Sequence, residues 1–133
     1  MTNDIAMLRP DGLVHSPAFS HVAVVPPGAT TIYVGGQNAV TGDGTLVGEG
    51  DVVAQTEQVM ANLHVALAAA GATVHDLVML TILLFDEVDL AVAYPVAAAE
   101  LGGAAPLVLA ARVTGLAVPG ALLEVSAVAA VTS

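Results

Sequence analysis

QTEQVMANL, at residues 55–63, is the segment from which the fold can be worked out. Asp51 precedes it as a good N-cap residue, and the sequence predicts a helix from Val52 to Ala70 that stops at Gly71. Apolar and small side chains recur through this helix at helical spacing, which predicts one stripe packed on a sheet. The stripe comprises Val52, Thr56, Val59, Met60, Leu63, Leu67 and Ala70.

A polar ribbon runs beside that stripe. Gln55, Gln58 and Asn62 stand at positions i, i+3 and i+7, so their side chains follow one another along the helix. The favoured interpretation is that they meet solvent or cap the backbone of a neighbouring loop.

Two short β-rich runs precede the helix. His21 to Val25 and Thr30 to Val34 are separated by Pro26-Pro27-Gly28, and this pattern predicts a hairpin. A further turn at 41–44 leads to a possible short strand at 45–47.

The second half of the chain predicts three strands and another helix. Leu77 to Phe85 is a continuous apolar run of branched residues, typical of a strand covered on both faces, and with the preceding helix it suggests a βαβ unit. A helix is expected within Asp89 to Leu101, with Pro95 in its first turn. Strands are expected at Leu107 to Leu116 and Ala121 to Val131.

The element order predicts an α+β sandwich with two helices on one face of a mixed sheet. Residues 1–133 are expected to form a single domain, in which 1–15 are irregular.

The charge balance argues against one class of function, nucleic-acid binding. Twelve acids stand against two arginines and no lysine, for a formal charge of −10. That charge repels phosphate backbones, so nucleic-acid binding is not expected.

Apolar residues make up 56% of the chain, yet no stretch reaches the roughly 18 uninterrupted apolar residues of a membrane helix. We therefore expect no membrane association. The apolar content also favours a homo-oligomer, because one small chain buries little surface alone. The sequence holds no cysteine and shows no secretion signal, which fits a cytoplasmic protein. No pair of histidines has metal-binding spacing, so no metal site is expected.

From about Ser16 to Val131 the chain resembles the Rid family of reactive-intermediate deaminases, also called YjgF-like or L-PSP-like proteins. The resemblance rests on short motifs that occur in the expected order. These are Val34-Gly35-Gly36-Gln37, Thr41-Gly42, Gln55-Thr56-Glu57-Gln58 with Asn62-Leu63, Gly71-Ala72, Asp76-Leu77-Val78 with Thr81, and Leu123-Glu124-Val125 with Ala127-Val128-Ala129.

The resemblance implies a chorismate-mutase-like fold that assembles as a homotrimer, with ligand clefts between subunits. Active members hydrolyse enamines and imines such as 2-aminoacrylate without a metal or cofactor. An arginine holds the substrate carboxylate, because a planar guanidinium matches a carboxylate in a bidentate pair, and a glutamate positions the attacking water.

This chain departs from the family pattern at the substrate clamp. The family's arginine stands two residues after a proline, and here Pro106 is followed two residues later by Val108. Phe19 replaces an expected tyrosine, and Tyr94 corresponds to an expected asparagine. The resemblance retains the Gly35, Gly36 and Gln37 backbone and Glu124 as site positions. Standard activity on 2-aminoacrylate is therefore not expected.

Glu124 is the best catalytic candidate, because a carboxylate in an apolar strand is costly unless it has a partner or a task. The alternative is an inter-subunit hydrogen bond or a pair with Arg112. Arg112 shares a strand face with Val108 but lies about 13 Å further along at roughly 3.3 Å per residue. It is therefore expected to pair with an acid at the subunit interface rather than to bind ligand. His21 is a weaker candidate for a base.

Two hypotheses for the function follow. In the first, the protein hydrolyses or otherwise transforms a small enamine, imine or related reactive metabolite, as an imine deaminase or a pathway-specific hydrolase or cyclase, with Glu124 placing water or moving a proton. In the second, it is a non-catalytic trimer that binds a small metabolite or regulates a partner.

Overall fold

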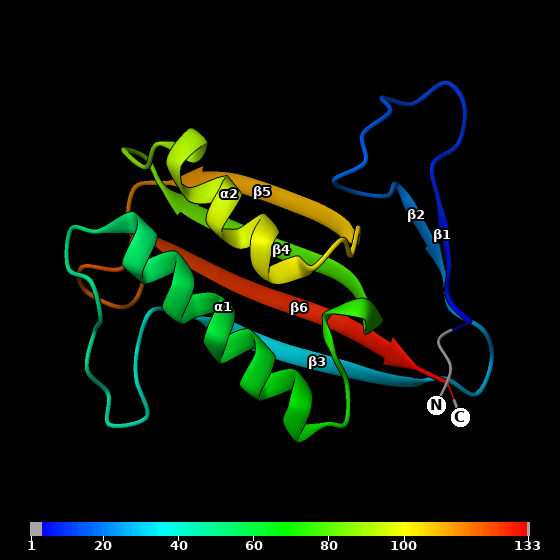
Figure 1. The fold of residues 1–133 in the computed structure, drawn as a ribbon, viewed down its shortest axis with the longest axis horizontal. Coiled ribbons are helices and arrows are strands. Elements are labelled where there is room, and N and C mark those ends of the chain that lie inside the picture. The colour runs from blue at the N-terminus through cyan, green and yellow to red at the C-terminus, as the bar shows by residue number, and fades with distance from the viewer. Residues whose placement is uncertain (1–3, 133) are drawn as a thin grey trace.

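The computed structural model describes residues 4–132. Its main sheet has four strands in the order β3-β6-β4-β5, and two helices pack on it (Figure 1). β3 pairs antiparallel with β6, β6 antiparallel with β4, and β4 parallel with β5. The bounds are β1 Ala6–Leu8, β2 Val22–Val24, β3 Thr30–Gln37, α1 Val52–Ala69, β4 Leu77–Phe85, α2 Leu90–Leu101, β5 Leu107–Val113 and β6 Leu123–Val131, with a 3-10 turn at Val74–Asp76.

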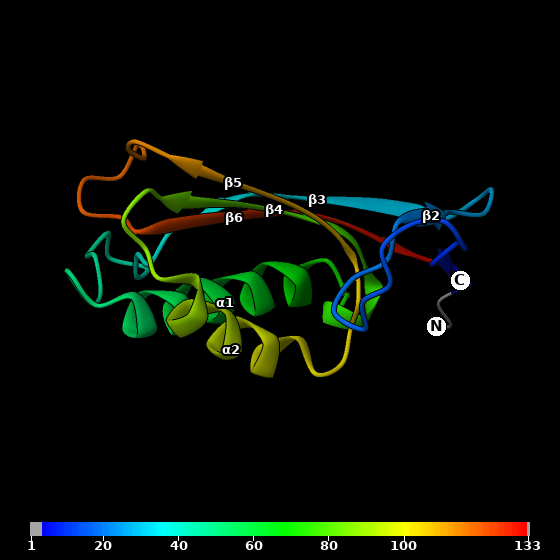
Figure 2. The same cartoon turned by 90° about the horizontal axis from the view of Figure 1, so that it is seen from above.

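Both helices lie on one face of the main sheet, as predicted, and no helix or strand among residues 4–132 packs on the other face (Figure 2). The core fills the space between α1 and the sheet. Leu63 and Leu67 of α1 are fully buried there against Leu80 of β4 and Ala129 of β6. The α+β class and the two-helix layer are therefore confirmed.

α1 matches its predicted bounds to within one residue. Asp51 caps its start by accepting a hydrogen bond from Ala54 N at 3.1 Å, and Gly71 follows its end with a φ of 74°. β4 also has its predicted bounds. Only its helix-side face is covered by this chain, however, so the prediction of cover on both faces is wrong for a single chain: no helix follows to pack on the other side.

Two residues of the polar ribbon on α1 hydrogen-bond to the backbone of neighbouring loops, which was one of the two predicted roles. Gln55 is fully buried: its Nε2 donates to Gly48 O and Gly120 O, and its Oε1 accepts from Leu122 N. Asn62 Nδ2 likewise donates to two carbonyls of the loop after β3. These bonds fix both loops that border the start of α1.

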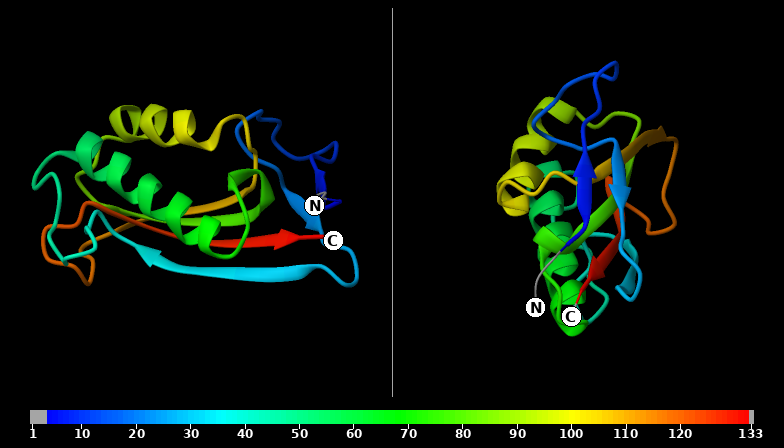
Figure 3. Two further views of the ribbon diagram at one scale, coloured as in Figure 1. Left: turned by 60° about the horizontal axis from the view of Figure 1, so that its bottom comes forward. Right: turned by 90° about the vertical axis from the view of Figure 1, so that its right-hand side faces the viewer.

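The predicted hairpin between His21–Val25 and Thr30–Val34 is wrong. β2 pairs with β1 in a separate two-stranded sheet, and β3 pairs with β6. Figure 3 shows β1 and β2 set off from the main sheet. Pairing with β6 engages Thr30 to Val34 and Gln37 of β3 and brings Val34 into the core, whereas a hairpin with three-residue β2 would leave most of β3 unpaired.

Four smaller predictions also need correction. Residues 1–15 were expected to be irregular, but Ala6–Leu8 form a strand because they pair with β2. Pro95 is the sixth residue of α2 rather than in its first turn, because Asp89 caps the helix earlier by accepting from Ala91 N. The possible strand at 45–47 amounts to one bridge between Val40 and Leu46, since the turn before it closes on Asp43. The last two strands are each shorter than predicted and lie on either side of β4.

No helix among residues 4–132 is both long and apolar enough to cross a bilayer.

Candidate functional site

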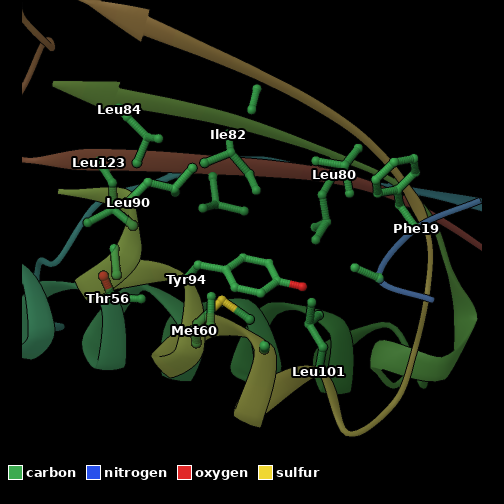
Figure 4. A pocket seen from close by; sticks show the side chains of 17 residues that line it. Phe19, Thr56, Met60, Leu80, Ile82, Leu84, Leu90, Tyr94, Leu101 and Leu123 are labelled. Atoms are coloured by element: carbon green, nitrogen blue, oxygen red, sulfur yellow. The ribbon is translucent and has the colours of Figure 1, made fainter. Parts of the chain in front are cut away.

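A cavity of about 230 Å³ lies between the two helices and the sheet (Figure 4). α1 forms its floor, α2 one wall, and β4, β5 and β6 its roof. The segment that precedes β2 closes one end. Its lining residues are Ala18, Phe19, Thr56, Met60, Leu80, Ile82, Leu84, Leu90, Ala93, Tyr94, Ala97, Ala98, Leu101, Val108, Ala110, Leu123 and Val125.

The cavity is apolar, and none of the described residues that line it carries a charge. Two of these side chains have a hydroxyl group. Thr56 Oγ1 donates to Val52 O within its own helix at 2.7 Å, so its hydrogen is already used. Tyr94 extends its ring across the cavity with its oxygen directed along it. The surroundings favour uncharged ligands, because burying an unpaired charge among these side chains is costly.

The segment 17–20 covers one end of the cavity and is fastened at several points. Arg9 donates from Nε to Phe19 O at 3.0 Å and from Nη2 to Pro17 O at 3.3 Å. Ser20, which is buried, donates from its backbone N to Pro106 O and from Oγ to Ala105 O. These bonds attach the segment to the start of β5 and hold the Phe19 ring over the cavity.

His21 packs its ring edge-on against Phe19, with ring centroids 5.4 Å apart. Its Nε2 lies 2.7 Å from Val14 O, and because a carbonyl only accepts, Nε2 carries the hydrogen. His21 is not among the residues that line the cavity. Its observed contacts therefore hold Phe19 in place.

Val108 lies on β5 in the cavity roof and is 40% exposed, so the position of the family's arginine does face the cavity. Arg112 does not take the place of the missing arginine. Its Nη1 donates to Asp86 O at 3.1 Å and to Val88 O at 2.8 Å, which ties β5 to the connection between β4 and α2. Within residues 4–132 backbone carbonyls accept the hydrogen bonds of Arg112, and its expected pairing with an acid at the subunit interface stays a prediction.

Glu124 lies on the other face of the sheet. Its neighbours Leu123 and Val125 line the cavity, and successive strand residues point to opposite faces, so its side chain points away from the helices. It packs on Gly36, where an added Cβ would lie 2.7 Å from Glu124 Oε2. The alternative pair with Arg112 is therefore wrong within one chain, because Arg112 projects to the helix side.

The remaining predicted site residues stay near Glu124. Gly35 borders a shallow hollow on the open face together with Tyr33 and Ser126. Gln37 ends β3 and donates from Nε2 to Gly35 O. Three predicted positions, Phe19, Tyr94 and Val108, thus meet in the cavity. Arg112 lies on the helix side outside it, and the other predicted residues lie on β3 and β6 near Glu124.

Sequence reasoning missed much of the cavity floor. Thr56 and Met60 were assigned to the packing stripe of α1, and they do belong to it. The same stripe lines the cavity because α2, made largely of alanine in its middle, leaves space beside it. The alanines at 97 and 98 were the sequence feature from which a cavity beside α2 could have been suspected.

Comparisons with known proteins place the chain in a family. A sequence model of the family described as Endoribonuclease L-PSP matches residues 13–131. A protein of unknown function of the Rid family from Yersinia pestis, YyfB, is 33% identical, with a TM-score of 0.85 over 96% of this chain and 99% of that one.

Two further structures are more distant. Rv2704 from Mycobacterium tuberculosis, a member of the YjgF/YER057c/UK114 family, is 27% identical with a TM-score of 0.61, covering 96% of this chain and 100% of its own. RidA from the Antarctic bacterium Psychrobacter sp. PAMC 21119 is 25% identical with a TM-score of 0.68, covering 89% and 98%. The chain therefore belongs to the Rid/YjgF family, whose sequence model is described as Endoribonuclease L-PSP.

Proposed function

We propose that this protein takes a small, uncharged, mainly apolar metabolite into the cavity between its helices and its sheet. The observation that carries the proposal is the cavity lining, which has no charged side chain among the described residues. The lining includes Val108, at the position where the family pattern has its carboxylate-binding arginine. An engineered apolar cavity of about 150 Å³ holds benzene. The cavity of about 230 Å³ therefore has room for a ring or short chain with a few added atoms.

The proposed reaction is hydrolysis of a neutral imine or enamine. An enamine first tautomerises to the imine, its N–H proton being replaced by a proton on the β carbon. Water then adds to the imine carbon, the carbon–nitrogen bond breaks, and the products are a carbonyl compound and ammonia. Glu124 is the proposed group that positions the water or accepts its proton. Since Glu124 lies across the sheet from its own cavity, it acts in this proposal on the cavity of a neighbouring copy.

Assembly as a homotrimer is part of the same proposal. The open face of the sheet and the free edge of β5 leave apolar side chains exposed, among them Tyr33 at 79% and Leu109 at 48%. Contact between copies would bury these side chains and would bring Glu124 of one copy toward another. Gly36 matters here because it leaves room for the Glu124 carboxylate.

A second candidate is a trimer that binds the same ligand without transforming it. The observation that favours it is that no acid or base lines the cavity in the described chain apart from the Tyr94 phenol. Ribonuclease activity is not proposed, despite the description of the family, because the formal charge of −10 and the absence of lysine disfavour RNA.

A turnover assay tests the catalytic proposal. Ammonia release is measured with a ketimine that lacks a carboxylate and, separately, with 2-aminoacrylate generated in the assay. We expect turnover of the ketimine, little turnover of 2-aminoacrylate, and loss of activity in Glu124→Gln. If Glu124→Gln leaves ketimine turnover unchanged, Glu124 has no catalytic role.

Blocking the cavity provides the control for location. Ala97→Phe fills the cavity from α2, and Ala99→Phe places the same ring on the exposed side of the same helix. Only Ala97→Phe should abolish binding and turnover. Equal effects of the two variants would show that the ligand binds elsewhere.

A further inference from the structure

Among the described residues that line the cavity, the Tyr94 hydroxyl is the one side-chain donor whose hydrogen is unused. Among the other lining residues only Thr56 carries a hydroxyl, and it donates within α1. No group within residues 4–132 hydrogen-bonds to the Tyr94 hydroxyl. The residue is 49% exposed, so solvent has access to this side chain when the cavity holds no ligand.

The position of Tyr94 makes this donor available to a ligand. Figure 4 shows its ring lying between Ile82 and Met60, with the oxygen directed toward the end of the cavity near Leu101. All three of these neighbours are apolar. A ligand that fills this space displaces the water on the hydroxyl, and the hydroxyl then loses a hydrogen bond unless the ligand supplies an acceptor.

We propose that Tyr94 selects the ligand: it donates a hydrogen bond to a single acceptor atom, a carbonyl oxygen or an imine nitrogen, on an otherwise apolar molecule. This inference rests on the proposed function, because it assigns a ligand class to the same cavity. The expected ligands are monofunctional ketones, aldehydes or imines without a charged group. A hydrocarbon of the same shape leaves the hydroxyl unpaired and binds more weakly.

A matched pair of probes tests the assignment. Acetophenone and α-methylstyrene have the same shape and differ in that a carbonyl oxygen replaces a CH₂ group. Their dissociation constants are measured by calorimetry or NMR for the wild type and for Tyr94→Phe. A neutral hydrogen bond contributes about 0.5–1.5 kcal/mol, so the preference for acetophenone should fall roughly two- to tenfold in Tyr94→Phe. The affinity for α-methylstyrene should stay within about twofold.

Tyr33→Phe is the control, because it removes the same hydroxyl from an exposed residue on the opposite face of the sheet. It should leave the preference unchanged. If Tyr94→Phe keeps the wild-type preference while retaining the wild-type melting temperature, the role of Tyr94 is overturned and the cavity proposal survives. If neither probe binds the wild type, or if Ala97→Phe does not block them, both proposals are overturned.

Discussion

The two faces of the main sheet differ in what they are built to contact. The face under α1 and α2 encloses an apolar cavity whose described lining carries no charge. The opposite face holds Glu124, Ser126 and Tyr33, and no helix or strand in the described part of the chain covers it. Alternate residues of β6 supply both faces, so Leu123 and Val125 line the cavity while Glu124 between them points away.

In the proposed function, this difference separates ligand recognition from chemistry within one chain. The covered face would determine which small molecule fits, since packed side chains fix the shape and polarity of its cavity. The open face offers a carboxylate without a substrate cavity beside it in the same chain. Any reaction that uses both must therefore bring two copies together.

The largest expected effect contrasts adjacent residues of β4. Leu84 is buried on the helix side, whereas Leu83 is partly exposed on the open side. Leu84→Ala should lower the free energy of unfolding by about 2–5 kcal/mol, because it deletes a buried side chain. Leu83→Ala should cost less than half as much at protein concentrations where the chain is a monomer. Chemical denaturation measures both, and equal losses would contradict the contrast between the faces.

The next effect concerns Gln55, the buried amide on the covered side. Gln55→Ala should lower the free energy of unfolding by about 2–3 kcal/mol, since it leaves two backbone carbonyls and the Leu122 N–H without their partner. The exposed neighbour Glu57 is the control, and Glu57→Ala should change stability by no more than about 0.5 kcal/mol. A loss as small for Gln55→Ala would show that water replaces the amide.

A smaller effect is expected at Arg112, which fastens β5 to the start of α2. Arg112→Ala should cost about 1–2 kcal/mol through two lost hydrogen bonds, and it should weaken ligand binding because Leu90 and Tyr94 of α2 line the cavity. Arg112→Lys should recover part of both losses. If Arg112→Ala changes binding of a carboxylate ligand alone, Arg112 acts as a ligand group instead.

The covered face of the sheet could be predicted from the sequence better than the open face. The helical spacing of α1 and the apolar run of β4 were sufficient for the covered layer, because local periodicity reports which side of an element is buried. Strand pairing was mispredicted for β2 and β3. Each strand could pair with a near or a distant strand, and the local sequence pattern does not show that β3 pairs with β6 instead of β2. Glu124 was identified as a candidate, but the face it points to depends on the register of β6.

The cavity was not predicted, for a related reason. Its volume arises where the alanines of α2 lie opposite Met60 and Leu80, and these three segments are distant in sequence. Pro95 misled the assignment of the start of α2, because a capping aspartate at Asp89 outweighed the usual preference of proline for a first turn.

The smallest expected effect belongs to neither face. Hydrogen bonds hold the pKa of Asp43 below its ordinary value of 3.8. The bond from the Thr41 side chain has the largest effect, and bonds from Thr45 add to it. A lowered pKa in the folded state stabilises the loop above about pH 4, and this contribution is lost as the pH falls through the folded value. NMR titration of the Asp43 carboxyl carbon should show this lowered pKa, and Thr41→Val should raise it. A midpoint at or above 3.8 in the wild type would contradict the assignment.

The most direct test of the central claim compares a neutral ligand with its charged counterpart. Acetophenone and phenylglyoxylate share a phenyl ketone, and the second adds a carboxylate. Calorimetric titration of the wild type should show that acetophenone binds more tightly, and Val108→Arg should reverse the order by restoring a guanidinium in the cavity roof. Tighter binding of phenylglyoxylate to the wild type would contradict the claim that this cavity accepts uncharged ligands.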